Sequence, residues 1–147
     1  MKTAIEFKET QFSYILLSFL ALFVGIIVFS GYQSKGGWVI ILLLVAILVA
    51  VFYKLTIVID DYGILASFGI GFLSRRMNFQ EMDVSTIQLI DVPWYYGIGI
   101  RYTSAGIIYN TKHNKAIRIV SKDRKKVFLV GTDHYEEIKS ILLQKNN

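Results

Sequence analysis

The stretch KLTIVIDDYG, residues 54–63, marks the point where the hydrophobic pattern of the chain changes from helical to β. Leu55, Ile57 and Ile59 occupy alternate positions, and a strand places alternate side chains on one face of a sheet. The stretch ends in Asp-Asp-Tyr-Gly, a composition that favours a turn. The sequence therefore predicts that a β domain begins at Lys54 and that helical segments precede it.

Short segments with strand composition continue after this one, separated by Gly, Asn, Asp or Pro93. They lie at residues 64–70, 72–79, 85–92, 98–103, 106–110, 116–120 and 127–130. Strands this short and this frequent predict an antiparallel sheet curled into a barrel or sandwich of about seven strands.

The C-terminal segment has a helical pattern instead. Asp133 and Glu136 have the spacing of a capping box, and Tyr135, Ile138 and Leu142 share one helical face. The predicted fold class is α+β, in which residues 54–147 form the β domain and a C-terminal helix caps it.

Two apolar runs precede the β domain, at about 12–31 and 37–53. The uncharged stretch of the first run from Phe12 to Phe29 has 18 residues, so as a helix it would be ~27 Å long at ~1.5 Å per residue, close to the thickness of a hydrocarbon core. The second run is slightly shorter, and a glycine-rich turn joins the two. No cleavage site follows the first run, so a signal peptide is disfavoured. Residues 1–53 are therefore predicted to form a transmembrane helical hairpin.

Lysines near the ends of these runs predict an orientation. Lys2, Lys8 and Lys54 lie on one side of the predicted hairpin and Lys35 on the other. The positive-inside rule then places both termini in the cytoplasm. The expected location is the bacterial inner membrane, with more than one pass.

The composition bounds the chemistry. Of the 147 residues, 54% are hydrophobic and 18% charged, against about 45–50% and about 25% in typical soluble proteins. The chain has no cysteine, and its two histidines, His113 and His134, show no metal-ligand spacing and no acid–base partner. The sequence predicts no catalytic residue, cofactor or metal, and a net charge of +5 without stacking platforms disfavours nucleic-acid binding.

Two segments carry a family resemblance. YGIGIRY at residues 96–102 and VFLVGT at residues 127–132, which runs into the last helix, are the most specific features. Together with the strand order and the preceding hairpin, they make residues 54–143 resemble the bacterial PH-like domain family. The resemblance implies a β-barrel or sandwich with a capping helix and a binding role, because this fold elsewhere binds phosphoinositides, peptides or proteins.

The Gly97–Arg101 segment has two interpretations. In a strand, Gly97, Gly99 and Arg101 share one face, so Arg101 can cover the space that the glycines leave. Alternatively, Arg101 is the centre of an anion or peptide site. Neither this segment nor Gly69–Gly71 completes a phosphate-binding motif.

Basic and aromatic residues supply the other candidate contacts. The candidate lipid contacts are Lys122, Arg124, Lys125 and Lys126, together with Arg75 and Arg76. The first four have the composition of a hairpin tip, which is either simply solvated or in contact with lipid phosphates. Trp94, Tyr95 and Tyr96 follow Pro93 and either cover the core or meet a partner.

These features predict a non-enzymatic, membrane-anchored interaction or scaffolding protein that presents a PH-like domain in the cytoplasm. The alternatives are a module that binds anionic lipid headgroups and an auxiliary subunit of a membrane complex. The expected partners are the lipid bilayer and a second copy of the chain or another membrane protein.

Overall fold

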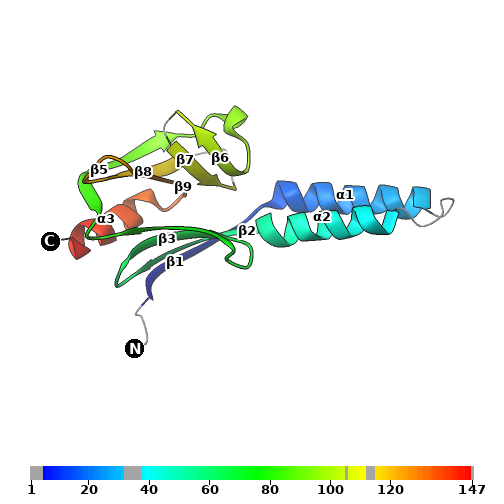
Figure 1. Ribbon diagram of the computed structural model, residues 1–147, viewed down its shortest axis with the longest axis horizontal. Coiled ribbons are helices and arrows are strands. Elements are labelled where there is room, and N and C mark those ends of the chain that lie inside the picture. The colour runs from blue at the N-terminus through cyan, green and yellow to red at the C-terminus, as the bar shows by residue number, and fades with distance from the viewer. Residues whose placement is uncertain (1–4, 32–37, 105, 112–114, 147) are drawn as a thin grey trace.

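The computed structural model describes residues 5–31, 38–104, 106–111 and 115–146. Two β-sheets face each other, a helix lies between them at one end, and a helical hairpin projects from the other end (Figure 1). This arrangement places the hairpin and the C-terminus at opposite ends of the long axis.

The first sheet has four strands in the order β1-β2-β3-β4, with every neighbouring pair antiparallel. Its strands are β1 (Ile5–Phe12), β2 (Lys54–Asp60), β3 (Gly63–Phe68) and β4 (Leu73–Asn78). Leu55, Ile57 and Ile59 of β2 are fully buried, as their alternation predicts.

The second sheet has five strands in the order β5-β8-β9-β7-β6. Its strands are β5 (Met82–Asp91), β6 (Gly99–Thr103), β7 (Gly106–Asn110), β8 (Lys115–Ser121) and β9 (Val127–Gly131). The pair β7–β9 is parallel, so the predicted all-antiparallel pairing is wrong here. The reason is the order of the strands: β8 lies beyond β9, and the return of the chain places β9 beside β7 in the same direction.

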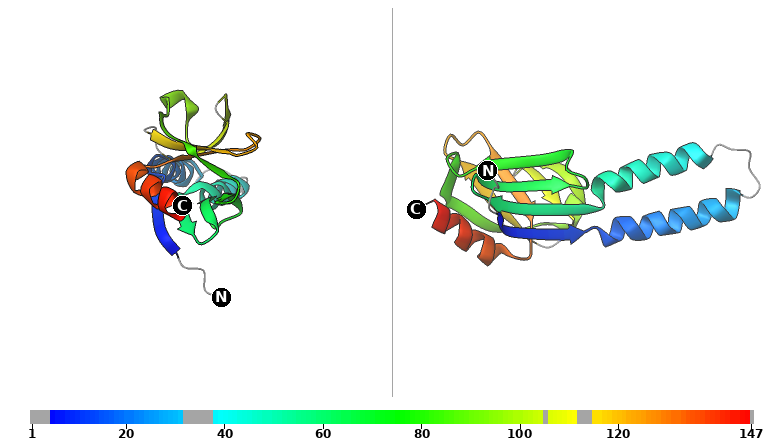
Figure 2. Two further views of the ribbon diagram at one scale, coloured as in Figure 1. Left: turned by 90° about the vertical axis from the view of Figure 1, so that its left-hand side faces the viewer. Right: turned by 90° about the horizontal axis from the view of Figure 1, so that it is seen from below.

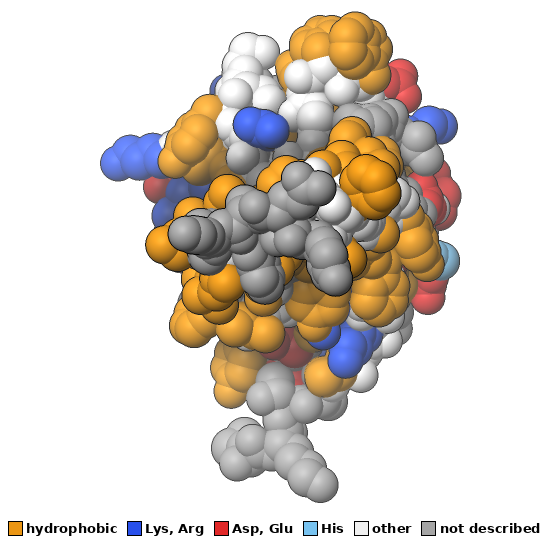
Figure 3. Space-filling model, turned by 90° about the vertical axis from the view of Figure 1, so that its right-hand side faces the viewer, with side chains coloured by type: hydrophobic (Ala, Val, Ile, Leu, Met, Phe, Trp, Pro, Cys, Tyr) orange, Lys and Arg blue, Asp and Glu red, His pale blue; other side chains and the backbone are white. Residues whose placement is uncertain are grey.

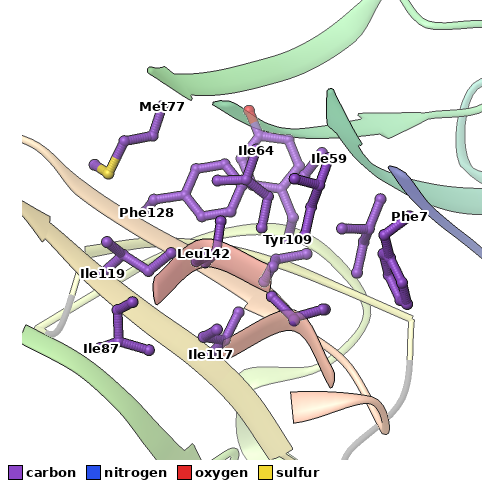
Figure 4. Packing of buried hydrophobic residues seen from close by; sticks show 14 of the residues in the cluster. Phe7, Ile59, Ile64, Met77, Ile87, Tyr109, Ile117, Ile119, Phe128 and Leu142 are labelled. Carbon is purple, nitrogen blue, oxygen red and sulfur yellow. The ribbon is translucent and has the colours of Figure 1, made fainter. Parts of the chain in front are cut away.

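The core fills the space between the sheets and includes the C-terminal helix α3 (Tyr135–Lys145). Figure 4 shows side chains of both sheets and of α3 pointing into this common interior. Ile138 and Leu142 of α3 are fully buried, which confirms the predicted apolar face. The N-cap of α3 is His134 and not the predicted Asp133. The His134 side chain makes no capping hydrogen bond to the helix.

The hairpin consists of α1 (Tyr14–Gly31) and α2 (Trp38–Phe52) and continues directly from two paired strands. Strand β1 leads into α1, and α2 leads into β2 (Figure 2). At the base, the backbone N–H of Ser13 donates to the carbonyl of Tyr53 over 2.9 Å. The sequence does not predict β1, so the first sheet begins before the hairpin and resumes after it.

A membrane-spanning role for this hairpin is not supported. The first eight described residues, up to Phe12, belong to β1, so α1 has 18 residues, and α2 has 15. A helix that spans the ~30 Å hydrocarbon core needs about 20 residues. Across the described ranges, the structure holds no helix with both the length and the apolar character to cross a membrane.

This finding contradicts three predictions: the transmembrane hairpin within residues 1–53, the membrane anchor, and the multi-pass inner-membrane location with both termini in the cytoplasm. The predicted turn covers residues 30–37, but Ser30 and Gly31 belong to α1. Lys2, Lys35 and residues 32–37 lie outside the described residues.

A buried polar cluster fastens β1 to the second sheet. The Gln11 side-chain amide donates to the Gly131 carbonyl over 2.8 Å and accepts a bond from the Thr111 hydroxyl over 2.7 Å. The Thr132 hydroxyl donates to the Glu9 carboxylate over 2.6 Å. Because these groups satisfy one another, they close one side of the sandwich without leaving an unpaired buried amide.

Candidate functional site

Apolar side chains cover the outside of the hairpin. Phe29 is 89% exposed and Phe19 is 67% exposed. The exposed residues of this surface are Ile15, Phe19, Leu22, Phe23, Val24, Ile26, Val28 and Phe29 on α1, and Val39, Ile40, Ile41, Leu43, Leu44, Ile47 and Leu48 on α2. We call them the apolar hairpin surface. Figure 3, which faces this end of the molecule, shows that hydrophobic side chains dominate it.

A helix that is apolar on every side is normally buried, because exposed apolar area costs about 25 cal/mol per Å². Contiguous apolar patches of this kind mark interaction sites. The apolar hairpin surface is therefore the first candidate contact surface of the molecule.

A groove of about 470 Å³ lies at the base of the hairpin, between the helices and the start of β6. Its walls are Ile15, Leu16 and Phe19 of α1, Leu48 and Phe52 of α2, and residues 97–101. We call it the base groove. Gly99 faces the Phe52 ring, and a Cβ atom at Gly99 would lie 3.7 Å from it, in ordinary van der Waals contact. The φ angles of Gly97 and Gly99 are +69° and +98°, a region that favours glycine, so these residue types shape the wall.

Arg101 lies at the edge of the base groove, on β6, and is exposed. Its guanidinium is next to Gly97, with Nε and Nη2 each 3.6 Å from where a Cβ of that residue would stand. None of the ion pairs within the described residues involves Arg101. A cation therefore stands beside an apolar groove.

The three aromatic residues after Pro93 divide between the two predicted roles. They form a short 3-10 helix, η1 (Trp94–Tyr96). Tyr96 is half-buried and packs on the small cluster around Val92 and Ile108, so it covers the core. Trp94 and Tyr95 are 79% and 68% exposed, and their rings meet edge-on 6.2 Å apart. These two residues are therefore available to a partner.

Arg75 and Arg76 are adjacent on β4, so their side chains leave opposite faces of the sheet. The Arg76 guanidinium donates two bonds to the Asp60 carboxylate, both 2.8 Å long. The Arg76 hydrogen bond, with backbone N–H groups of Tyr62 and Gly63, lowers the pKa of Asp60 against the opposing effect of burial. Arg76 therefore serves the fold at the β2–β3 turn.

The predicted basic tip is the turn between β8 and β9, at the end of the sandwich away from the hairpin (Figure 1). All four of its cations, Lys122, Arg124, Lys125 and Lys126, are exposed. The Asp123 carboxylate accepts bonds from the Ser121 hydroxyl and from the Lys125 backbone N–H, which lowers the pKa of Asp123. The Lys126 ammonium pairs with Glu81 over 2.9 Å.

The predicted cationic candidates therefore do not share one cavity. Arg101 shares the base groove with the hairpin, whereas Arg76 lines a different cavity with Asp61 and Lys145, and the basic tip lines neither. Sequence reasoning missed the base groove because its walls come from three segments far apart in the chain. The glycine pair at residues 97 and 99 was the one available signal.

Titratable side chains do not gather into a reactive centre in the part of the chain that the structure describes. No group of three His, Asp or Glu residues there has the geometry to hold a metal ion. His134 lies 3.4 Å from Glu137, and both side chains are more than half exposed, which is ordinary for the first turn of a helix.

Comparison of the chain with protein-family models, with curated proteins and with solved structures gives no match. The PH-like resemblance therefore stays a prediction.

Proposed function

We propose that this protein is a non-enzymatic interaction module that docks its helical hairpin into a larger protein assembly as an auxiliary subunit. The observation that carries the proposal is the exposure of the apolar hairpin surface, which reaches 89% at Phe29. Covering one such side chain contributes about 1.5–3 kcal/mol to association, so covering many of them together can offset the loss of translational and rotational freedom.

The hairpin adds little to the core of the β domain. Among its described residues, Phe52 at the base packs against the core cluster, where its ring lies 5.5 Å from that of Phe68. Side chains farther out, such as Phe29 and Ile40, are largely exposed. Their hydrophobicity is thus available for association.

A protein occupant suits the shape and size of this hairpin. Because the helices are apolar on all sides, the occupant has to surround them, as the interior of a helical assembly does. Ser18, Ala21 and Gly25 lie on one exposed face of α1, and a Cβ at Gly25 would meet nothing within 4 Å. The Ser18 hydroxyl donates to the Tyr14 carbonyl over 2.8 Å, so this face offers a partner helix a close approach without an unpaired hydroxyl.

Site-specific photo-crosslinking in cells tests the proposal. A benzophenone amino acid replaces Phe19 or Phe29 on the hairpin, and, as the matched control, exposed Tyr62 on the β2–β3 turn. We expect one defined protein adduct at both hairpin positions and none at Tyr62. Adducts with lipid alone, or the same protein adduct at all three positions, would contradict the proposal.

A pair of charge substitutions sharpens this test. Leu22→Glu combined with Leu44→Glu introduces carboxylates into the apolar hairpin surface, and we expect recovery of the protein adduct to fall at least tenfold. Leu143→Glu, on the exposed side of α3, is the control and leaves recovery unchanged. Unchanged recovery with the double variant would exclude the hairpin as the docking element.

Contact with anionic lipid headgroups is a second candidate, and the observation that favours it is the exposed basic tip. Each cation near an anionic surface is worth ~1 kcal/mol. Vesicles containing phosphatidylserine should bind the chain less after substitution of Lys122, Arg124 and Lys125 by Gln, and less with added salt. Binding that ignores both changes would remove this candidate.

A further inference from the structure

The base groove combines two features that the cavities beside Arg76, beside His134 and between the two helices do not combine. Its walls are almost entirely hydrophobic, Phe19, Leu48 and Phe52 among them, and one cation, Arg101, also lines it. The cavity next to His134 is lined mainly by charged and polar side chains, and a third, between the two helices, is apolar throughout.

We propose that the base groove binds a long-chain fatty acid, with the acyl chain along Phe19, Leu48 and Phe52 and the carboxylate on Arg101. The volume of about 470 Å³ lies in the lower half of the range of about 300–1,000 Å³ that is usual for small-molecule sites, so it suits one chain. The apolar walls recognise the acyl chain because its burial removes apolar surface from water.

The head of the ligand is assigned by the guanidinium. Arginine presents a planar fork of donors that matches a carboxylate with two parallel bonds. The ion pairs among the described residues join other cations to the carboxylates, for example Arg76 to Asp60 and Lys126 to Glu81. The guanidinium of Arg101 therefore has its donors available. Gly97 has no side chain, which keeps the space beside the guanidinium open.

This proposal goes beyond the docking of the hairpin. The base groove shares Ile15, Phe19 and Leu48 with the apolar hairpin surface, but Phe29 does not line it, so the adduct at Phe29 tests docking alone. A crosslinked protein partner without fatty-acid binding, or fatty-acid binding without a partner, distinguishes the failure of one from the failure of the other.

Binding to the full chain, purified in a non-ionic maltoside detergent, tests the fatty-acid site. The probe is radiolabelled hexadecanoate, and the competitors are unlabelled hexadecanoate and hexadecanol, which has the same chain with an uncharged head. We expect hexadecanoate to compete at least tenfold better, because the charged head adds a charge-assisted pair with Arg101. Equal competition by the two compounds would overturn the assignment of the head.

Substitutions locate the site. Arg101→Gln should weaken hexadecanoate binding about tenfold or more, and Arg124→Gln, at the exposed basic tip, should leave it unchanged. Leu48→Trp fills the base groove and should abolish binding, whereas Ile47→Trp, exposed on the same helix, should not. Circular dichroism confirms that each variant is folded. Wild-type binding by folded Arg101→Gln or folded Leu48→Trp would overturn the proposal.

Discussion

The β domain and the hairpin are built from the same types of apolar residue, which are buried in the domain and exposed on the hairpin. Isoleucine, leucine and phenylalanine form both, but Ile57 and Leu55 of β2 are fully buried, whereas Ile40 of α2 and Leu22 of α1 are more than 60% exposed. In the domain, two sheets and α3 supply partners for every apolar side chain that the strands turn inward. In the hairpin, the main contacts of each helix are with the other helix, and at the base Phe52 also packs against the domain.

This contrast shows that hydrophobic composition alone does not tell which residues hold a fold together. Apolar side chains stabilise the folded chain only where the same chain covers them. Those of the hairpin are therefore expected to contribute to association, and those of the sandwich to folding.

The largest expected effect compares one truncation in each region. Phe128→Ala, at a side chain that is 1% exposed, should lower the free energy of unfolding by about 3–5 kcal/mol because it leaves a cavity. Phe29→Ala, at 89% exposed, should change it by less than about 0.5 kcal/mol. Denaturant unfolding of the full chain measures both. Similar losses for the two variants would erase the distinction between the regions.

The junction between the regions predicts the next effect. Gly69 has φ +55°, and a Cβ there would lie 2.3 Å from the carbonyl oxygen of Ala50 and 2.4 Å from that of Val51. Gly71 has φ +96° and open space around it. Alanine adds left-handed strain at both positions, but only Gly69→Ala also brings a Cβ into collision with the end of α2. Gly69→Ala should therefore lower the free energy of unfolding by about 1–3 kcal/mol more than Gly71→Ala does, and lower the melting temperature further.

Equal melting temperatures for Gly69→Ala and Gly71→Ala would show that the contact of the β3–β4 turn with the end of α2 does not stabilise the junction. Hydrogen exchange at the Ser13 amide, which bonds Tyr53, reports the same junction locally. It should be faster in Gly69→Ala than in Gly71→Ala.

Within the domain, the Asp60–Arg76 pair predicts a dependence on pH. The folded state lowers the pKa of Asp60, so the stabilisation is present above the unfolded pKa of about 3.9 and is lost as the pH falls through the lower folded value. Asp60→Asn should cost about 1.5–3 kcal/mol at neutral pH, because it weakens a charge-assisted hydrogen bond. Urea unfolding from pH 7 to pH 2 should show the difference between wild type and variant shrinking in acid. A constant difference would exclude the pair as its cause.

The smallest effect is expected at the basic tip. Replacing Lys122, Arg124 and Lys125 by Gln removes exposed charges that form no ion pair with the described carboxylates, so stability should change by no more than about 0.5 kcal/mol. Lys126→Gln breaks the exposed pair with Glu81 and should cost at most about 1 kcal/mol. Thermal unfolding checks both, and a loss above 2 kcal/mol in either would assign the tip a role in the fold.

Local patterns predicted the burial within single elements, because alternation in β2 and the helical spacing of Ile138 and Leu142 report burial directly. They did not predict β1, because its burial is confined to few positions, such as Phe7 and Gln11, and charged residues lie between them. The same error lengthened the first apolar run to Phe12 and supported a membrane span that the helix lengths contradict.

Long-range geometry explains what else escaped prediction. The base groove needs α1, α2 and the Gly97–Arg101 segment together, and no local pattern indicates that they meet. Conversely, the adjacency of Arg75 and Arg76 in sequence suggested a shared site, but strand alternation sends them to opposite faces.

The β domain is expected to fold without the hairpin, because the hairpin serves docking. Because Ser13 and Tyr53 are joined by a backbone hydrogen bond at the base, residues 14–52 can be replaced by Asn-Gly, the preferred two-residue turn between antiparallel strands. The shortened chain should keep its β-sheet circular dichroism and unfold cooperatively, and the protein partner captured through Phe29 should no longer co-purify with it. An unfolded shortened chain, or one that keeps the partner, would contradict the account.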